Sequence, residues 1–382
     1  MVEIQGKYNT AKVFTDTAES STLAQVETLC NQEGFANSKI RIMPDCHAGK
    51  GCTIGTTMTI SDKIIPGVVG VDINCGMLVV EIDTKSVELQ RLDKSIKMNV
   101  PHGSGVHRKP HRWADKVDLS ELRCKDHIKW KNQHYAIGSL GSGNHFIELD
   151  KDEDDNLYLV IHTGSRNLGL QVANYYQQAA YDALHIKDHH RKDIGSTDNL
   201  ENTNDIPFDL SYCEGQLFED YIHDMKIAQD FATINREAIS DIIQCGMRWK
   251  IKDQWETRHN YIDLDTMILR KGAISAQNGE TAIIPMNMRD GSLIVRGKGN
   301  PDWNYSAPHG AGRIMSRSTA RNSIPMQDYK DSMKGIFTTC ICSATVDEAP
   351  QAYKPMDEIV ANIQDTCDIV KVISPVYNFK AC

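Results

Sequence analysis

Short apolar runs that end in polar, glycine-flanked turns recur along this chain, and they limit the folds open to it. One such turn, Gly70 to Met77, holds Asp72 and Cys75 three positions apart. Four more segments of the same character each place a histidine beside glycines or small residues: Gly138 to Glu148, Val160 to Arg166, His259 to Tyr261 and Ala307 to Arg313. The pattern predicts short strands whose ends direct reactive side chains toward a shared centre.

Segments with helical periodicity lie between the predicted strands. Leu23, Val26 and Leu29 lie at helical spacing within residues 20–33. Further helices are predicted over residues 84–98 and 169–186, as one or two long helices over 217–250, and over 356–371. Short strands are predicted over residues 39–82, 157–162 and 272–298, a basic loop over 101–113, and a polar surface excursion over 187–212. The sequence therefore predicts a mixed α/β fold of the α+β type, with a core of short strands flanked by helices.

The chain as a whole has the composition of a globular protein from a reducing compartment. Its eleven cysteines are an odd number without repeated CxxC spacing, which argues against disulfides and favours a cytoplasmic location. The sequence contains no apolar run of membrane-spanning length. The net charge of -9 predicts no general affinity for nucleic acid, so any nucleic-acid site must be a local basic patch. Segments with reactive side chains fall in both halves, which favours one domain over residues 1–382, or two that fold together.

The turn that carries Asp72 and Cys75 predicts a metal site. A carboxylate and a thiolate from one turn favour a borderline-soft ion such as manganese, zinc or iron over magnesium alone. Neutral imidazoles are the commonest metal ligands, and their second nitrogen needs an orienting partner, for which Glu148 and Asn260 are candidates. The histidines of the glycine-flanked turns are His145, His162, His259 and His309. Any single histidine is more often a surface or hydrogen-bonded residue, so spacing alone leaves the imidazoles unassigned.

Other segments are typical of phosphate binding. The glycine-rich turns offer backbone N–H groups to anions, and Thr163 to Arg166 adds a hydroxyl and a guanidinium. The second half gathers Arg270, Lys271, Arg289, Arg296, Lys298, Arg313, Arg317 and Arg321. Each of these cations is more commonly a solvated surface charge. Together with a metal and a reactive histidine, they indicate phosphoryl or nucleotidyl transfer.

With these motifs in order, the chain resembles the RtcB family of RNA ligases. The matching segments run in family order over nearly the whole length: Met43 to Gly51, Gly70 to Met77, Gly138 to Glu148, Ile161 to Arg166, His259 to Asn260, Arg270 to Ala273, His309 to Arg313 and Asp347 to Lys354. The resemblance implies a single RtcB-like domain and a GTP- and manganese-dependent ligase. Such an enzyme joins RNA ends bearing a 3′-phosphate or 2′,3′-cyclic phosphate to 5′-hydroxyl RNA ends, in RNA repair or tRNA splicing, and we expect a monomer.

The resemblance also implies roles for individual residues. It implies a two-manganese site bridged by Cys75 and completed by Asp72, His145, His162 and His259. His309 is expected to be the nucleophile that takes GMP from GTP as a histidine–GMP phosphoramidate. Nucleotide contacts are expected from Asn144, Glu148, Gly310, Gly312, Asn287, Tyr353 and Lys380. Contacts to RNA or phosphate are expected from Arg166, Lys271 and Arg313.

The chain also departs from the family pattern. Many relatives have Pro-Gly-Ser-Met-Gly where this chain has Pro285 to Arg289, so Asn287 replaces a serine hydroxyl and Arg289 adds a cation. Residues 187–212 match none of the family segments. These changes suggest a subgroup with its own RNA substrate, such as damaged tRNA or ribosomal RNA.

Two alternatives keep the same metal ligands. One is a metal phosphohydrolase or cyclic phosphodiesterase that has lost ligation, and the other is a non-catalytic binder of RNA ends. In each case we expect the RNA path along residues 106–113 and the cations of the second half.

Overall fold

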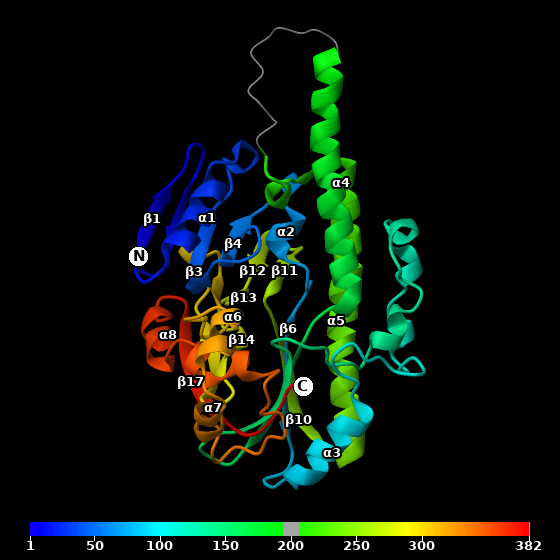
Figure 1. The fold of residues 1–382 in the computed structure, drawn as a ribbon, viewed down its shortest axis with the longest axis vertical. Coiled ribbons are helices and arrows are strands. Elements are labelled where there is room, and N and C mark those ends of the chain that lie inside the picture. The colour runs from blue at the N-terminus through cyan, green and yellow to red at the C-terminus, as the bar shows by residue number, and fades with distance from the viewer. Residues whose placement is uncertain (194–205, 382) are drawn as a thin grey trace.

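The strands of the protein form two large sheets (Figure 1). The computed structural model describes residues 1–193 and 206–381, with the backbone alone for residues 186–193. The first sheet has the order β1 (Val2–Gln5), β2 (Thr10–Val13), β3 (Ile40–His47), β4 (Ile54–Thr59), β12 (Ile268–Lys271) and β11 (Asn260–Asp263). The second has the order β10 (Ile251–Arg258), β6 (Gly76–Ile82), β8 (Leu157–Thr163), β7 (Phe146–Lys151), β17 (Cys367–Phe379), β15 (Gly291–Gly297) and β14 (Thr281–Asn287). Two short pairs join β13 (Ala273–Ser275) to β16 (Ser306–Pro308) and β5 (Lys63–Ile64) to β9 (Cys213–Glu214).

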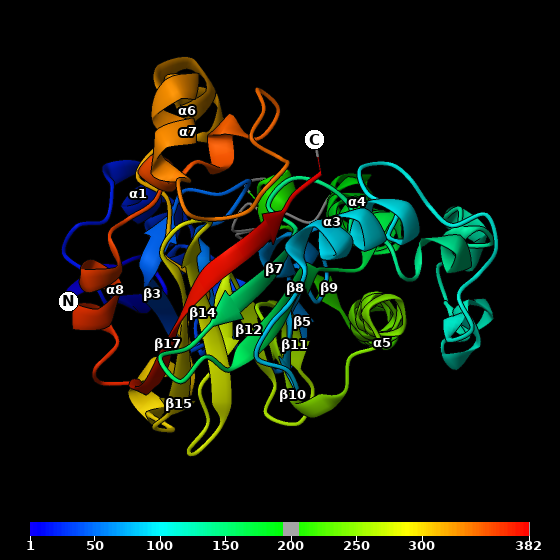
Figure 2. The same ribbon diagram turned by 90° about the horizontal axis from the view of Figure 1, so that it is seen from below.

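Eight α-helices in the described residues cover these sheets. They are α1 (Ser20–Cys30), α2 (Pro66–Val69), α3 (Leu89–Asn99), α4 (Arg166–Asp193), α5 (Gln216–Met247), α6 (Arg317–Ser323), α7 (Met326–Ser332) and α8 (Met356–Asn362). Helix α5 packs beside α3 and α4 and against β6 and β8 of the second sheet, and Figure 2 shows it nearly end-on. The mixed α/β class predicted from the sequence is therefore confirmed, and the described residues form no closed barrel.

The ends of several strands meet at one end of the second sheet. Register pairs Gly76 with Thr163 and with Arg258, and Phe146 with His162. Because β8 runs antiparallel to both β6 and β7, the residues that precede β6 and β7 lie beside the last residues of β8. The chain leaves β10 at the same place and enters β11 of the first sheet. The turns predicted to carry ligands thus lie at the junction of the two sheets.

Most of the elements predicted from periodicity are confirmed. Helix α1 covers most of residues 20–33, α3 begins later than predicted, and α4 extends the predicted helix at both ends. The one or two helices predicted over residues 217–250 are the single helix α5. Residues 157–162 lie within β8, and every residue of that strand is buried. Residues 39–82 and 272–298 form short strands, and residues 101–113 form no helix or strand. None of the helices in the described residues is long and apolar enough to cross a bilayer.

Two predictions are wrong in part. The helix predicted over residues 356–371 ends at Asn362, and residues 367–379 form β17 between β15 and β7. Residues 367–379 are rich in β-branched residues, which favour strands. Hydrogen bonding to β15 on one edge and to β7 on the other stabilises the strand over a helix. The surface excursion was predicted over residues 187–212. Of these, residues 187–193 belong to α4, and residues 194–205 lie outside the described part. Within residues 206–212 the prediction is wrong for Leu210 and Ser211, which are buried.

Candidate metal centre and adjoining cavity

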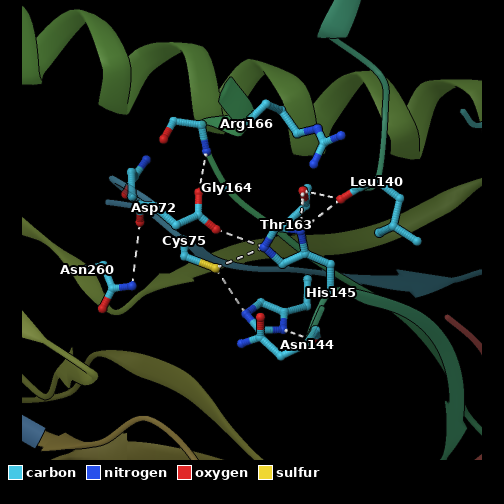
Figure 3. Close-up of polar contacts among 12 residues, drawn as sticks. Asp72, Cys75, Leu140, Asn144, His145, Thr163, Gly164, Arg166 and Asn260 are labelled. Atoms are coloured by element: carbon cyan, nitrogen blue, oxygen red, sulfur yellow. Dashed lines mark hydrogen bonds and ion pairs between the residues drawn. The ribbon is translucent and has the colours of Figure 1, made fainter. Parts of the chain in front are cut away.

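Five side chains that the sequence singles out converge where the strand ends meet, and Figure 3 shows three of them, Asp72, Cys75 and His145. Cys75 Sγ lies 3.5 Å from His145 Nε2 and 3.3 Å from His162 Nε2. His162 Nε2 lies 3.4 Å from His259 Nε2, and Asp72 Oδ2 lies 2.8 Å from His145 Nε2. These atoms form two overlapping groups of possible metal ligands, one with His162 and His259 and one with Asp72 and His145, and Cys75 belongs to both.

The backbone of the Asp72–Cys75 turn brings both side chains to this point. The Cys75 N–H donates to Asp72 O at 3.2 Å, and Asn74 takes a positive φ of 56°. Asp72 Oδ1 accepts a hydrogen bond from the Ser165 N–H at 3.1 Å. A Cβ at Gly164 would overlap the Asp72 carboxylate, so the glycine makes room for this close approach.

Backbone carbonyls lie at the Nδ1 atoms of two of the imidazoles. His145 Nδ1 lies 2.9 Å from Leu140 O, with Thr163 Oγ1 at 3.4 Å, and His162 Nδ1 lies 3.2 Å from Asn144 O. The expectation that Glu148 and Asn260 orient the imidazoles is therefore wrong for these two rings. An Nδ1–H that donates to a carbonyl leaves Nε2 facing the centre, where His145 Nε2 lies 2.8 Å from Asp72 Oδ2.

Burial favours the neutral form of His162 and His259. Burial lowers the pKa of His162 and of His259 well below the usual range, and neighbouring histidines lower each further. Burial raises the pKa of Asp72, but the hydrogen bond from His145 and the charge of that ring outweigh it, so the pKa falls below its usual value. Burial and the charge of Asp72 raise the pKa of the Cys75 thiol well above its usual range. The site thus offers lone pairs, a carboxylate and a thiol that a metal ion would deprotonate on binding.

This donor set fits metal binding. His162 Nε2 and His259 Nε2 lie 3.4 Å apart, and His259 Nδ1 is buried without a hydrogen-bond partner among the described residues. A cation at this point could be coordinated by both Nε2 atoms. The mixture of thiol, imidazole and carboxylate suits a borderline-soft divalent ion.

Two consecutive residues of α5 hold the segments that carry four of the ligands. The Asn235 amide accepts from the Gly138 and Ser139 N–H groups at 2.8 and 3.1 Å and donates to Gly164 O at 3.2 Å. Arg236 Nη1 donates to Asn74 O at 2.7 Å and to Thr163 O at 2.6 Å. Both side chains are fully buried. The spacing patterns gave no signal for this pair, because it lies inside a helix among apolar residues.

His309 lies beside the metal centre and has a partner of its own. Its ring centroid is 5.0 Å from that of His259. Its Nδ1 and its backbone N lie 2.7 and 3.1 Å from Asp45 Oδ2, on β3. Asp45 is fully buried. Because the carboxylate binds Nδ1, Nε2 is left as the free nitrogen of this ring.

A cavity of about 240 Å³ adjoins His309 and the metal centre. Its lining includes His309 and all the residues expected to contact the nucleotide: Asn144, Glu148, Asn287, Gly310, Gly312, Tyr353 and Lys380. Arg313, expected to contact RNA or phosphate, also lines it. Burial raises the pKa of Glu148 to about 7, although a hydrogen bond from Asn378 opposes the shift. The cavity therefore combines an imidazole with glycines, cations and a weakly acidic carboxyl.

Glu348 gathers the cations of this cavity around itself. Lys380 Nζ lies 2.9 Å from Glu348 Oε2, and the Tyr353 hydroxyl donates to the same oxygen at 2.9 Å. Arg313 Nη1 donates to Glu348 Oε1 at 3.4 Å. Burial raises the pKa of Glu348, but Lys380 and Arg317 outweigh it and hold the pKa at about 2. The ionised carboxylate fixes these cations at the cavity wall.

The chain matches a family model described as "tRNA-splicing ligase RtcB" over residues 25–131 and 114–381. The chain belongs to the RtcB family of RNA ligases. Among its relatives, RNA-splicing ligase RtcB1 of Escherichia coli is 31% identical over 90% of both chains. The tRNA-splicing ligase RtcB of Aeropyrum pernix is 28% identical over 89% of this chain and 87% of the relative. That of Thermococcus kodakarensis is 26% identical over 91% and 88%.

Within this RtcB chain, the unusual residues 285–289 end strand β14 and begin the turn to β15. Asn287 Oδ1 accepts from the backbone N–H groups of Arg289 and Asp290, both at 3.0 Å, and Asn287 Nδ2 donates to Asp290 at 2.8 Å. Arg289 pairs with Asp290 at 2.6 Å. Asn287 therefore lines the cavity, but its side chain is already hydrogen-bonded to Arg289 and Asp290. The charge of Arg289 is balanced by Asp290.

The three residues expected to contact RNA or phosphate lie in different places. Arg313 lines the cavity beside Glu348. Lys271 lies on another side of His309, where Nζ donates to Gly67 O at 2.9 Å. Arg166 lies behind the 138–145 turn, with Nε 3.2 Å from Ser139 Oγ and Nη2 3.0 Å from Gly103 O. Arg270, one of the cations in the expected RNA path, is fully buried and bonded to Ser306.

Asp45 and Glu348 are the site residues that the sequence reasoning missed. Both lie in segments that match the RtcB family, Met43 to Gly51 and Asp347 to Lys354. Each is a carboxylate that lies in a matched segment and has no role assigned to it. That combination could have identified both residues from the sequence.

We expect Asn235→Ala to unfold more easily than the wild type, because it leaves the buried Gly138 N–H without a hydrogen-bond partner. The free energy of unfolding should fall by about 1–3 kcal/mol, measured by chemical denaturation. Asn132→Ala, at an exposed position, is the control and should change it little. Equal stability of Asn235→Ala and the control would contradict the clamping role.

Proposed function

We propose that the protein joins RNA ends bearing a 3′-phosphate or 2′,3′-cyclic phosphate to 5′-hydroxyl RNA ends, with GTP as the energy source and manganese as the metal, in RNA repair or tRNA splicing. The observation that carries this proposal is His309. Its Nδ1 is held by the Asp45 carboxylate, and its ring lies between the metal centre and a cavity lined by nucleotide-binding groups. A neutral imidazole placed in this way is a competent nucleophile toward phosphorus.

The residues of the metal centre support two manganese ions. Cys75 would bridge them, with His162 and His259 on one side and Asp72 and His145 on the other. Manganese bound there would neutralise phosphate charge and align reacting phosphates for in-line displacement. The Nδ1 contacts of His145 and His162 with carbonyls fix the tautomers that such ligation needs.

His309 would carry the nucleotide. Its Nε2 attacks the α-phosphorus of GTP, so that a P–N bond forms as the bond to the β-phosphate breaks and pyrophosphate leaves. Asp45 stabilises the positive charge that develops on the ring, as a carboxylate does for an imidazolium. The N–H groups of Gly310 and Gly312 lie in the cavity wall, where they can bind the phosphate.

The guanine would be recognised at the far end of the cavity. An ionised Glu148 accepts hydrogen bonds from guanine N1–H and N2–H, which favours GTP over ATP. Lys380, held by Glu348, offers a donor to the guanine carbonyl. Asn144, Asn287, Tyr353 and Arg313 line the same cavity and complete the nucleotide contacts.

GMP would then pass to RNA. An oxygen of the RNA 3′-phosphate attacks the phosphorus on His309, and the P–N bond breaks. The 5′-hydroxyl next attacks the activated 3′-phosphate, loses its proton and displaces GMP. A cyclic end is first hydrolysed to the 3′-phosphate.

The remaining parts of the proposal concern location and assembly. We infer a cytoplasmic protein, because the cysteines of the described residues are free thiols. We also infer a monomer, because one chain supplies every group proposed for catalysis.

We expect labelled GTP and manganese to label the wild-type protein covalently and to leave His309→Ala unlabelled, as seen by gel electrophoresis. Asp45→Asn should be labelled more slowly, by about 10–100-fold, because the Nδ1 partner is no longer a carboxylate. Ligation of defined 3′-phosphate and 5′-hydroxyl strands should require GTP. Opening of cyclic ends without GTP, with no labelled protein and no joined product, would favour the phosphodiesterase instead.

Cys75→Ser should lose most of its bound manganese, because a hydroxyl is a far weaker acid and ligand than a thiol. Metal analysis after dialysis measures this directly. Cys245→Ser, an exposed cysteine on α5, is the matched control and should retain the metal. Full occupancy in Cys75→Ser would contradict the bridging role.

Labelling by GTP should rise as the pH passes through about 7, because Glu148 then ionises and becomes an acceptor for guanine. Burial raises this carboxyl pKa, so the neutral form prevails below that value and the ionised form above it. Glu148→Gln should label more weakly, with a flatter profile and less preference for GTP over ATP. Coincident pH profiles for the two proteins would rule out Glu148 as the titrating group.

A further inference from the structure

A second cavity, of about 290 Å³, also reaches the reactive groups. It shares Asn144, His259 and His309 with the nucleotide cavity, but Asp72 lines it in place of Glu148 and Lys380. The two cavities therefore meet at His309 from different sides. A molecule in the second could reach a group carried on His309 while the first is filled.

The inner part of this cavity carries a buried cation. Lys271, on β12, is 7% exposed. Its Nζ donates to Gly67 O at 2.9 Å and to Lys50 O at 3.4 Å, which are the hydrogen bonds it makes to the described residues. An ammonium has three N–H donors, so one is left for an anion in the cavity. Lys50 is exposed and adds a second cation to the lining.

The outer wall comes from the segment that matches none of the family motifs. Phe208 begins the 3₁₀ turn Phe208–Leu210, lines the cavity and is 41% exposed. Gln177, on α4, donates to Phe208 O at 2.5 Å and to Ser211 O at 3.1 Å, and accepts from the Gly67 N–H at 2.7 Å. A buried glutamine thus fixes the wall to the same α2 residue that binds Lys271.

An aromatic ring and cations in one cavity are the combination that binds a single nucleic-acid strand. Bases stack on the ring whatever their sequence, and phosphates bind the cations. The 5′-hydroxyl end of an RNA is uncharged, whereas the 3′ end in the proposed reaction bears a phosphate. The buried charge of Lys271 therefore favours the phosphorylated end.

We propose that this second cavity receives the phosphorylated 3′ end of a single RNA strand, with its last base stacked on Phe208 and its terminal phosphate directed to Lys271. The inference rests on the proposed function. It assigns GMP and the RNA end to different cavities that both reach His309, so that a phosphate oxygen can form its bond to phosphorus on the face opposite Nε2 as the P–N bond breaks. Phe208 is then a specificity-determining residue of the RNA site.

Binding of a fluorescent, 3′-phosphorylated RNA strand in manganese tests the proposal without any need for guanylylation. Phe208→Ala should weaken binding by about ten-fold, as expected for the loss of one stacked base, and Phe208→Trp should restore it. The substitution keeps the backbone carbonyls that Gln177 binds. Met98→Ala, an exposed residue on α3, is the control.

A strand that lacks its 3′-terminal base should bind the wild type about ten-fold more weakly, and Phe208→Ala should then have no further effect. A cyclic-phosphate end should behave like the 3′-phosphate, whereas a 3′-hydroxyl end should bind more weakly. Phe208→Ala should leave labelling by GTP unchanged.

Equal binding by the wild type and Phe208→Ala, with or without the terminal base, would overturn the proposal. So would a loss confined to strands whose 5′-hydroxyl end is free and whose 3′ end is blocked, since the cavity would then hold the other end. An unlabelled wild type that still shows the Phe208 effect would refute the GTP-dependent ligase and keep the RNA site.

Discussion

The buried guanidinium of Arg236 is the interaction on which the rest of the site depends. It donates to the carbonyls that end the Asp72–Cys75 turn and strand β8, and it pairs with Glu256 of β10 at 2.6 Å. A buried arginine is tolerated only when its charge and its donors find partners, so α5 and these strand ends must be placed together. Asn235 extends the same constraint to the turn that precedes His145. A helix that provides no ligand therefore determines where the ligands lie.

The acids around the site differ in how their charge is balanced. Asp72, Asp45 and Glu348 each face an imidazole or an ammonium at 2.9 Å or less. Glu148 and Asp150 lie on one face of β7 at positions of nearly complete burial, and burial raises the pKa of both. The first three acids bind their partners within the protein and hold them still. Glu148, by contrast, faces the nucleotide cavity with its charge incompletely balanced, which leaves it free to accept donors from a bound base.

The sequence predicted features that depend on neighbouring residues better than features that depend on contacts between distant segments. Periodicity predicted α1 and α5 correctly, and the glycine-flanked turns singled out four histidines, because both signals are local. The resemblance to the family, and not the spacing, implied which of them share a site with Asp72 and Cys75. The helix predicted over 356–371 was wrong because the choice between helix and strand there depends on β7 and β15, which lie far away in the sequence. Asp45, Glu348 and the Asn235–Arg236 pair were missed for a related reason. Each acts on a distant segment, and nothing in its own neighbourhood reports that partner.

The position of His309 explains why it differs from the other histidines of the glycine-flanked turns. It follows β16, and its carboxylate partner lies on β3 of the first sheet, whereas Cys75, His145 and His162 lie at strand ends of the second sheet. His259 connects β10 of the second sheet to β11 of the first and so lies between the two groups. The fold thus places His309, the proposed nucleophile, and most of the candidate metal ligands on different sheets, and it joins them through His259. Because His309 lines both cavities, a group carried on this ring in the proposed reaction can arrive from one cavity and leave into the other while the ring stays in place.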